Sequence, residues 1–157
     1  MDKKVTKLVT ILGSVGLLVV LTGPMAHAAS IDITDKMPKE GYVVLDDNSH
    51  VVDASSPLLK EAAKPKQYSK SDYLFGNMKD VIYVKNGKFT CYSEMLNYLT
   101  GYKASHSYFI HEKRRHYSSA KVGNGKLVRS ANTAPGKRSH ATAKGYGKAF
   151  AYYGYSD

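Results

Sequence analysis

The sequence has a single cysteine, Cys91, among its 157 residues. One thiol cannot form an internal disulfide framework or a thiolate metal cluster, which excludes small disulfide-stapled folds and cysteine-based metal sites. The chain must therefore fold by packing and sheet hydrogen bonds alone, which is feasible for a chain of this size. We expect Cys91 to be a buried, inert thiol on a strand.

Acidic residues are scarce in the last part of the chain. Residues 99–157 contain 11 Lys/Arg but only 2 Asp/Glu, whereas residues 30–98 contain 9 Lys/Arg and 10 Asp/Glu. Such asymmetry indicates a polyanionic partner for the basic half, for example a membrane surface, teichoic acid, a phosphorylated wall precursor or nucleic acid. The alternative is that the charge only keeps a secreted protein soluble.

Only one long apolar run is present, and it lies at the N-terminus. Three lysines precede the 14 residues 8–21, Gly23-Pro24 breaks the run, and Ala26-His27-Ala28 offers the small residues that signal peptidase accepts. This pattern predicts a secretory signal peptide over residues 1–28, cut after Ala28, and a secreted, extracellular protein. Without a second apolar segment or a long amphipathic helix, a helical pore-former is disfavoured.

Residues 29–98 are predicted to form an N-terminal extension of mixed α and β structure, of unknown role. Residues 42–45 and 50–52 predict a small hairpin, and Ser56-Pro57 predicts a helix start, with Pro65 ending that helix. Residues 64–71 are typical of a linker. Asn86-Gly87 predicts a type I′ turn between strands 81–85 and 88–92. Ser93 predicts the cap of a short helical turn that ends near Gly101.

Residues 99–157 are predicted to form a basic, mainly β domain. Alternation in residues 116–122, 138–144 and 149–153, with glycine turns at 123–125 and 145–147 and a Pro135-Gly136 turn, indicates about five short strands. Regular turn spacing favours a small antiparallel β-sandwich or barrel at the C-terminus.

The segment 111–116 (HEKRRH) resembles a zinc-protease helix, but its two histidines are five residues apart instead of four. On a helix they would point about 140° apart, whereas a tight hairpin turn would bring them together on opposite arms. A third ligand would have to be His106 or His140. We therefore predict that His111 and His116 support turn and strand structure, and we expect no metal and no cofactor.

Two readings of the basic residues lead to different functions. His116, Lys121 and His140 are the residues that could serve as base, charge stabiliser and acid in a nuclease toxin, which stays an alternative. We predict instead a protein that is not an enzyme and binds an anion. Arginine captures phosphate oxygens in a bidentate manner, and lysine adds a mobile point charge. The candidate target-binding residues are Lys113, Arg114, Arg115, His116, Lys126, Arg129, Lys137 and Arg138. Most tyrosines are expected in the core or in cross-strand pairs, with Tyr155 exposed.

Residues 101–155 contain a series of short motifs, whose residues are Ser107, Phe109, His111, His116, Gly136, Lys137, Tyr152 and Tyr153. The order and spacing of these motifs resemble the lactococcin 972 family of bacteriocins. The resemblance implies a small all-β sandwich and an unmodified, secreted bacteriocin that binds the wall precursor lipid II of related Gram-positive bacteria and blocks septum formation. It also implies a membrane-bound immunity transporter in the producer, and no nucleic acid partner is expected.

The chain departs from that family in two respects. Members of that family usually have a tryptophan near the start of the mature domain, whereas this sequence has none. Residues 30–98 have no counterpart in the family pattern. An alternative function is a secreted surface protein that binds teichoic acid or glycans through its charge without killing.

Overall fold

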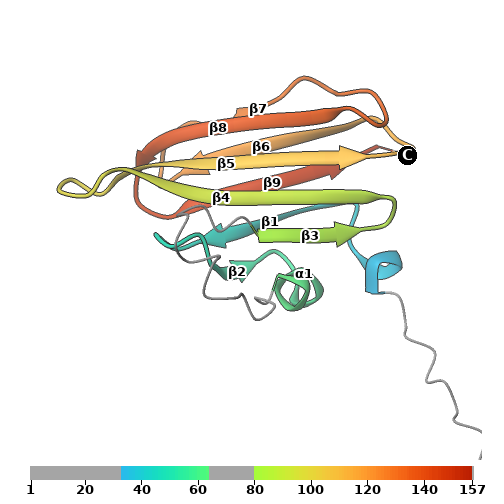
Figure 1. The fold of residues 1–157 in the computed structure, drawn as a ribbon, viewed down its shortest axis with the longest axis horizontal. Helices are drawn as coiled ribbons and strands as arrows, with labels where there is room; N and C mark the ends of the chain where they lie inside the picture. The colour runs from blue at the N-terminus through green and yellow to red at the C-terminus, as the bar shows by residue number, and fades with distance from the viewer. Residues whose placement is uncertain (1–32, 64–79, 157) are drawn as a thin grey trace, which may run out of the picture. The chain divides into compact units, whose positions relative to one another are not determined.

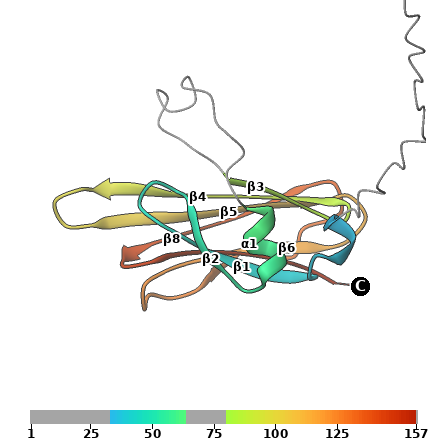
Figure 2. The same ribbon diagram turned by 90° about the horizontal axis from the view of Figure 1, so that it is seen from below.

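Two antiparallel sheets dominate the computed structural model, which describes residues 33–63 and 80–156. The prediction of a mainly β fold with an antiparallel sandwich is therefore confirmed, and Figure 2 shows the sheets as two layers. The predicted signal peptide (1–28) and linker (64–71) lie outside the described residues. The elements are η1 (Ile33–Lys36), β1 (Glu40–Leu45), β2 (Val51–Ala54), α1 (Pro57–Ala62), β3 (Asp80–Val84), β4 (Gly87–Asn97), β5 (Tyr102–His111), β6 (His116–Val122), β7 (Val128–Arg129), β8 (Arg138–Tyr146) and β9 (Ala149–Tyr155).

Strands from both sides of residue 98 share each sheet. Sheet A has the strand order β2-β1-β9-β6-β7, and sheet B has the order β3-β4-β5-β8. The strands that precede residue 98 thus lie together at one side of each sheet, with β1 beside β9 and β4 beside β5 (Figure 1). The predicted boundary between residues 98 and 99 falls in the turn of the β4–β5 hairpin.

Several local predictions are confirmed. Residues 43–45 of β1 pair with residues 51–54 of β2 as the predicted hairpin. The helix α1 begins at Pro57, and the Ser56 hydroxyl caps it by accepting a hydrogen bond from the Leu59 nitrogen at 3.2 Å. Neither this helix nor any other in the described residues is long and apolar enough to cross a membrane. Strands β6, β8 and β9 alternate buried and more exposed residues along most of their length, with the predicted faces.

The predicted helical turn at residues 93–98 is wrong, because β4 continues to Asn97. Ser93 is held in an extended conformation by the β1–β2 turn: its hydroxyl donates to the main-chain oxygen of Asp46, and its nitrogen donates to the Ser49 hydroxyl at 3.0 Å. The chain then turns at Asn97, whose side-chain oxygen accepts from the nitrogens of Leu99 and Thr100. Tertiary contacts thus override the local capping signal.

The turn between β3 and β4 is not of type I′. Val84 lies opposite Gly87, so Lys85 and Asn86 occupy the central positions, and Asn86 is the one of these two with a positive φ, 52°. Gly87 belongs to the ladder instead. A Cβ atom there would lie 2.9 Å from the main-chain oxygen of Ile110, so the close approach of β5 requires glycine.

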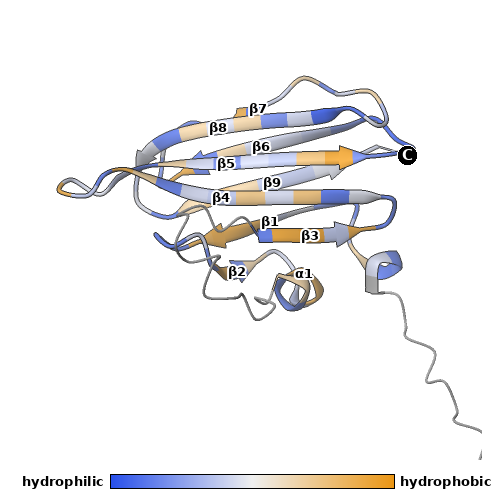
Figure 3. Ribbon diagram, viewed as in Figure 1, coloured by the Kyte–Doolittle hydropathy of each residue, from blue (hydrophilic) through white to orange (hydrophobic). Residues whose placement is uncertain are grey.

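The interior between the sheets has an aromatic part and a part with small side chains. Phe89, Phe109 and Tyr153 are fully buried, and the Tyr153 ring centroid lies 4.9 Å from that of Phe89 and 5.0 Å from that of Phe109. Elsewhere Ser105 and Ser107 donate from sheet B to main-chain oxygens of β9, at 2.8 and 2.6 Å. These short side chains let the layers approach closely, and in Figure 3 β6 and β9 are pale whereas β3 is mainly hydrophobic.

Cys91 is buried on β4, as predicted. Burial, and to a smaller extent the charge of Asp80, raises the pKa of its thiol well above the ordinary value. The thiol therefore stays protonated and inert at neutral pH.

Candidate functional site

The turn between β5 and β6 is built around the imidazole of His111. This ring is buried, and its Nδ1 accepts hydrogen bonds from the main-chain nitrogens of Lys113 at 3.2 Å and Arg114 at 3.0 Å. Burial first, then the neighbouring His116 and Arg114, lower the pKa of His111 below its ordinary value. A neutral ring keeps its Nδ1 lone pair, so His111 holds residues 113 and 114 in place.

His116, at the start of β6, ties this turn to the loop before β8. Its Nδ1 lies 2.9 Å from the main-chain oxygen of Arg114, and its Nε2 lies 2.8 Å from that of Lys137. The ring is 1% exposed and meets the Phe109 ring edge-on at 5.3 Å. Its role is to fix the turn, as predicted for both histidines, and their ring centroids lie 6.5 Å apart on the two arms of the hairpin.

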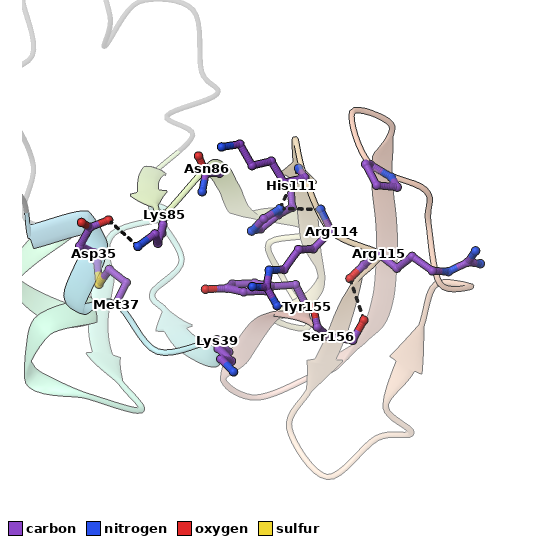
Figure 4. Close-up of a pocket in the computed structure, with 12 residues that line it drawn as sticks. Asp35, Met37, Lys39, Lys85, Asn86, His111, Arg114, Arg115, Tyr155 and Ser156 are labelled. Atoms are coloured by element: carbon purple, nitrogen blue, oxygen red, sulfur yellow. Dashed lines mark hydrogen bonds and ion pairs between the residues drawn. The ribbon is translucent and has the colours of Figure 1, made fainter.

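A groove of about 820 Å³ opens beside this turn (Figure 4). Its walls come from η1, the β3–β4 turn, the β5–β6 turn and the end of β9. The Tyr155 ring lies 4.3 Å from the His111 ring, and Figure 4 shows the Arg114 side chain reaching down beside Tyr155. We call this site the basic groove; its described lining is Asp35, Met37, Lys39, Lys85, Asn86, His111, Lys113, Arg114, Arg115, Pro135, Tyr155 and Ser156.

The basic groove has a strong excess of positive charge. Five of the lining residues are lysine or arginine, of which Arg115 turns its side chain away, and one, Asp35, is acidic. The Asp35 carboxylate lies 3.4 Å from the Lys85 ammonium group and neutralises part of the positive charge of the groove. Two exposed lysines, Lys39 and Lys113, face the same groove as the half-buried Arg114. Such an arrangement suits a ligand with several anionic oxygens, because arginine binds them in pairs and lysines adjust to them.

Of the four consecutive candidates in residues 113–116, two present their side chains to the groove in the predicted manner. Lys113 and Arg114 line it directly. Arg115 contributes its main chain, while its side chain points away in Figure 4 and its Nη2 donates to the main-chain oxygen of Asn132 at 3.5 Å. His116 is buried beneath the turn and acts through its position.

The remaining candidates lie elsewhere. The guanidinium carbon of Arg129 lies 3.5 Å from the centre of the Tyr117 ring on the outer face of sheet A, and that of Arg138 lies 5.3 Å from Tyr108 on the outer face of sheet B. Lys126 is exposed after the glycine turn that follows β6, and Lys137 is exposed before β8. The structure therefore divides the predicted basic surface among several faces.

Most of the family-motif residues build the sandwich. Ser107 and Phe109 are buried on β5, and Tyr153 is buried on β9. Gly136 has a φ of +71°, which the Pro135-Gly136 turn requires. Tyr152 lies half-buried on the outer face of sheet A, 5.3 Å from Tyr42.

Three groove residues were missed or misplaced by the sequence analysis. Lys39 and Lys85 belong to the predicted extension, and the pairing of β1 with β9 and of β4 with β5 brings them to the β5–β6 turn. Tyr155 was expected to be exposed, but it is half-buried against His111.

The residues considered for catalysis do not meet, and the four histidines considered for metal binding form two separate pairs, His111 with His116 and His106 with His140. His116 lies inside the sandwich, Lys121 is on the more exposed side of β6, and His140 is exposed on β8. In the described part of the chain no three histidine, cysteine or acidic side chains are arranged to hold a metal ion. The nuclease alternative thus gains no support from the geometry.

Comparison with known proteins finds a family match in the C-terminal part of the chain. A sequence model of the family described as Bacteriocin (Lactococcin_972) matches residues 96–153, so the predicted resemblance is confirmed. A search of the curated proteins and of the solved structures finds no match. The family match supports an antibacterial, bacteriocin-like protein, and it suggests that the protein is secreted and non-enzymatic.

Proposed function

We propose that this protein is a secreted bacteriocin that binds lipid II of related Gram-positive bacteria in the basic groove and blocks septum and wall synthesis. The observation that carries the proposal is the position of the groove: its central turn, residues 112–115, lies inside the family-matched segment. Producer cells would be protected by a membrane-bound immunity transporter.

The chemistry of the groove supports a pyrophosphate ligand. Lipid II carries a pyrophosphate, whose oxygens are spaced to accept a bidentate arginine and further lysines. Arg114 is half-buried beside Tyr155, so less of its side-chain entropy is lost on binding than for a fully exposed arginine. Lys39 and Lys113 are exposed at the rim and would complete the coordination.

The residues from outside the family match have a defined part in this proposal. Lys39 precedes β1 and Lys85 follows β3, so the N-terminal segment supplies two of the five basic residues of the groove. We therefore assign to residues 33–63 and 80–97 a role in forming the binding site as well as in completing both sheets.

The test is growth inhibition by the purified protein. The proposal predicts that related strains stop dividing with incomplete septa, and that added lipid II relieves the inhibition in proportion to its concentration. Folded protein that leaves every related strain growing normally, or inhibition that lipid II does not relieve, would contradict it.

A second candidate function is adsorption to teichoic acid or glycans without killing. It is favoured by the spread of Lys126, Arg129, Lys137 and Arg138 over faces away from the groove. Binding of that kind would be weakened by moderate salt, since exposed charges are screened within about 10 Å at 0.1 M ionic strength. Salt-sensitive adsorption to intact walls with no loss of viability would favour it over the bacteriocin.

A further inference from the structure

The outer face of sheet A contains a second hollow, of about 370 Å³, which the proposed function does not use. Cross-strand register places four of its residues in one row: Tyr42 pairs with Tyr152, Tyr152 with Ser119, and Ser119 with Arg129. The volume is within the range of small-molecule sites, about 300 to 1,000 Å³. We call it the tyrosine hollow.

Small residues shape the tyrosine hollow. Ser119 lies between Tyr152 and Arg129, and its short side chain leaves space between these two larger residues. At Gly154 a Cβ atom would lie 2.4 Å from the ring of Tyr117, which occupies that space instead. Glycine at 154 therefore allows Tyr117 to lie across β9.

Polar groups hold Tyr117 at the edge of the hollow. Its hydroxyl donates to the Glu40 Oε2 at 3.0 Å, and the Arg129 guanidinium carbon lies 3.5 Å from its ring centre. Burial and the hydrogen bond to Glu40 raise the pKa of Tyr117, so the hydroxyl remains a donor. The hollow thus combines tyrosine rings with one carboxylate and one guanidinium group.

The outer face of sheet B has a different character. There Tyr108 and His140 stack in parallel, with centroids 4.3 Å apart and planes 2° apart, and Tyr92 stacks on His106 at 4.3 Å. Stacked rings cover one another's faces, so only their edges are accessible to a ligand. In the tyrosine hollow, Tyr42 and Tyr152 are tilted by 46° and are not stacked in this way.

We propose that the tyrosine hollow binds an uncharged saccharide. The apolar face of a sugar ring packs on tyrosine, while its hydroxyls donate to Glu40 and accept from Arg129; both groups can form several hydrogen bonds. Because the carboxylate balances the guanidinium charge, an anion gains less here than in the basic groove. This site does not depend on the proposed function, since it shares no residue with the basic groove.

The test is titration of the secreted, full-length mature protein with two uncharged disaccharides, cellobiose and diacetylchitobiose, followed by NMR chemical shifts. We expect millimolar or tighter binding of at least one of them, with shifts centred on residues 117–119 and 152. The double variant Glu40→Gln/Arg129→Ala should weaken binding by about tenfold or more, because it removes charged hydrogen-bond partners. Both side chains are exposed, so the fold should survive.

Two controls locate the effect. Arg138→Ala removes an arginine over a tyrosine on the other sheet and should leave saccharide affinity unchanged. The double variant Lys113→Gln/Arg114→Gln alters the basic groove and should also leave saccharide affinity unchanged. This control separates failure of the saccharide proposal from failure of the lipid II proposal. Absence of binding by folded wild-type protein, or binding that survives Glu40→Gln/Arg129→Ala, would overturn the saccharide site.

Discussion

The hydroxyl of Tyr153 donates a hydrogen bond to the main-chain oxygen of Pro38 at 2.9 Å. Tyr153 lies at the end of the family-matched segment, and Pro38 precedes β1. This bond therefore joins the family-matched segment to the N-terminal segment, next to the paired strands β1 and β9 of sheet A. The nitrogen of Tyr155 likewise donates to the main-chain oxygen of Lys39, at 3.1 Å, beside the basic groove. The groove is therefore assembled where the two segments meet.

Tyr153→Phe should lower the free energy of unfolding by about 1 kcal/mol, the usual net value of one hydrogen bond. Tyr153→Ala should lower it by about 3 to 5 kcal/mol, because it also leaves a cavity beside Phe89 and Phe109. Urea denaturation measures both values. Equal stability of the wild type and Tyr153→Phe would show that the bond to Pro38 does not stabilise the fold.

The isolated fragment 96–157 should fail to fold as it does in the full chain. Removing β1 and β4 exposes the edges of β9 and β5 and uncovers Phe109 and Tyr153. We expect poor dispersion of its NMR amide signals and aggregation, whereas the chain from residue 29 gives a resolved spectrum. A well-dispersed fragment of equal thermal stability would contradict this prediction.

Stability should fall as the pH drops below about 6.5, the ordinary histidine pKa. The pKa of His111 is lowered in the folded state, so the unfolded chain takes up a proton first, and this loss continues until the pH reaches the folded pKa. His111→Asn should reduce the pH dependence, since an asparagine oxygen can still accept from residues two and three positions ahead. Denaturation midpoints at pH 7 and pH 5 test this; an unchanged pH dependence in the variant would contradict it.

Gly123→Ala should destabilise the protein far more than Gly101→Ala. Both glycines have a positive φ, +53° and +72°, so both variants carry a backbone strain of about 1 kcal/mol. At Gly123 the new Cβ would also lie 2.1 Å from the main-chain oxygen of Tyr146, whereas at Gly101 nothing lies within 4 Å. Thermal unfolding of the pair isolates the steric contribution, and equal losses would show that the turn at Gly123 relaxes freely.

The parts of the fold that local pattern specifies were predictable. Alternation marked β6, β8 and β9, and Ser56-Pro57 marked the start of α1. The five-residue spacing of His111 and His116 argued against one helical face and favoured a role in turn and strand structure, which the structure bears out. The prediction of a helical turn at residues 93–98 was wrong because Ser93 is held by Asp46 and Ser49, more than 40 positions earlier. No pattern in the sequence around Ser93 indicates these distant hydrogen bonds.

The basic groove was half predictable for the same reason. Lys113 and Arg114 stand out as part of a charge run, but Lys39 and Lys85 are isolated lysines in a segment with balanced charge. They join the groove only through the pairing of β1 with β9 and of β4 with β5, which depends on packing between distant segments.

The most direct test of the account is the affinity of the protein for lipid II in vesicles, with lipid-only vesicles as background. We predict that Lys113→Gln/Arg114→Gln weakens binding by about tenfold or more, while Lys144→Gln, an exposed lysine on β8 outside the groove, leaves it unchanged. Circular dichroism checks that both variants are folded. Equal affinity of the groove variant and the wild type would contradict the claim that the basic groove holds the wall precursor.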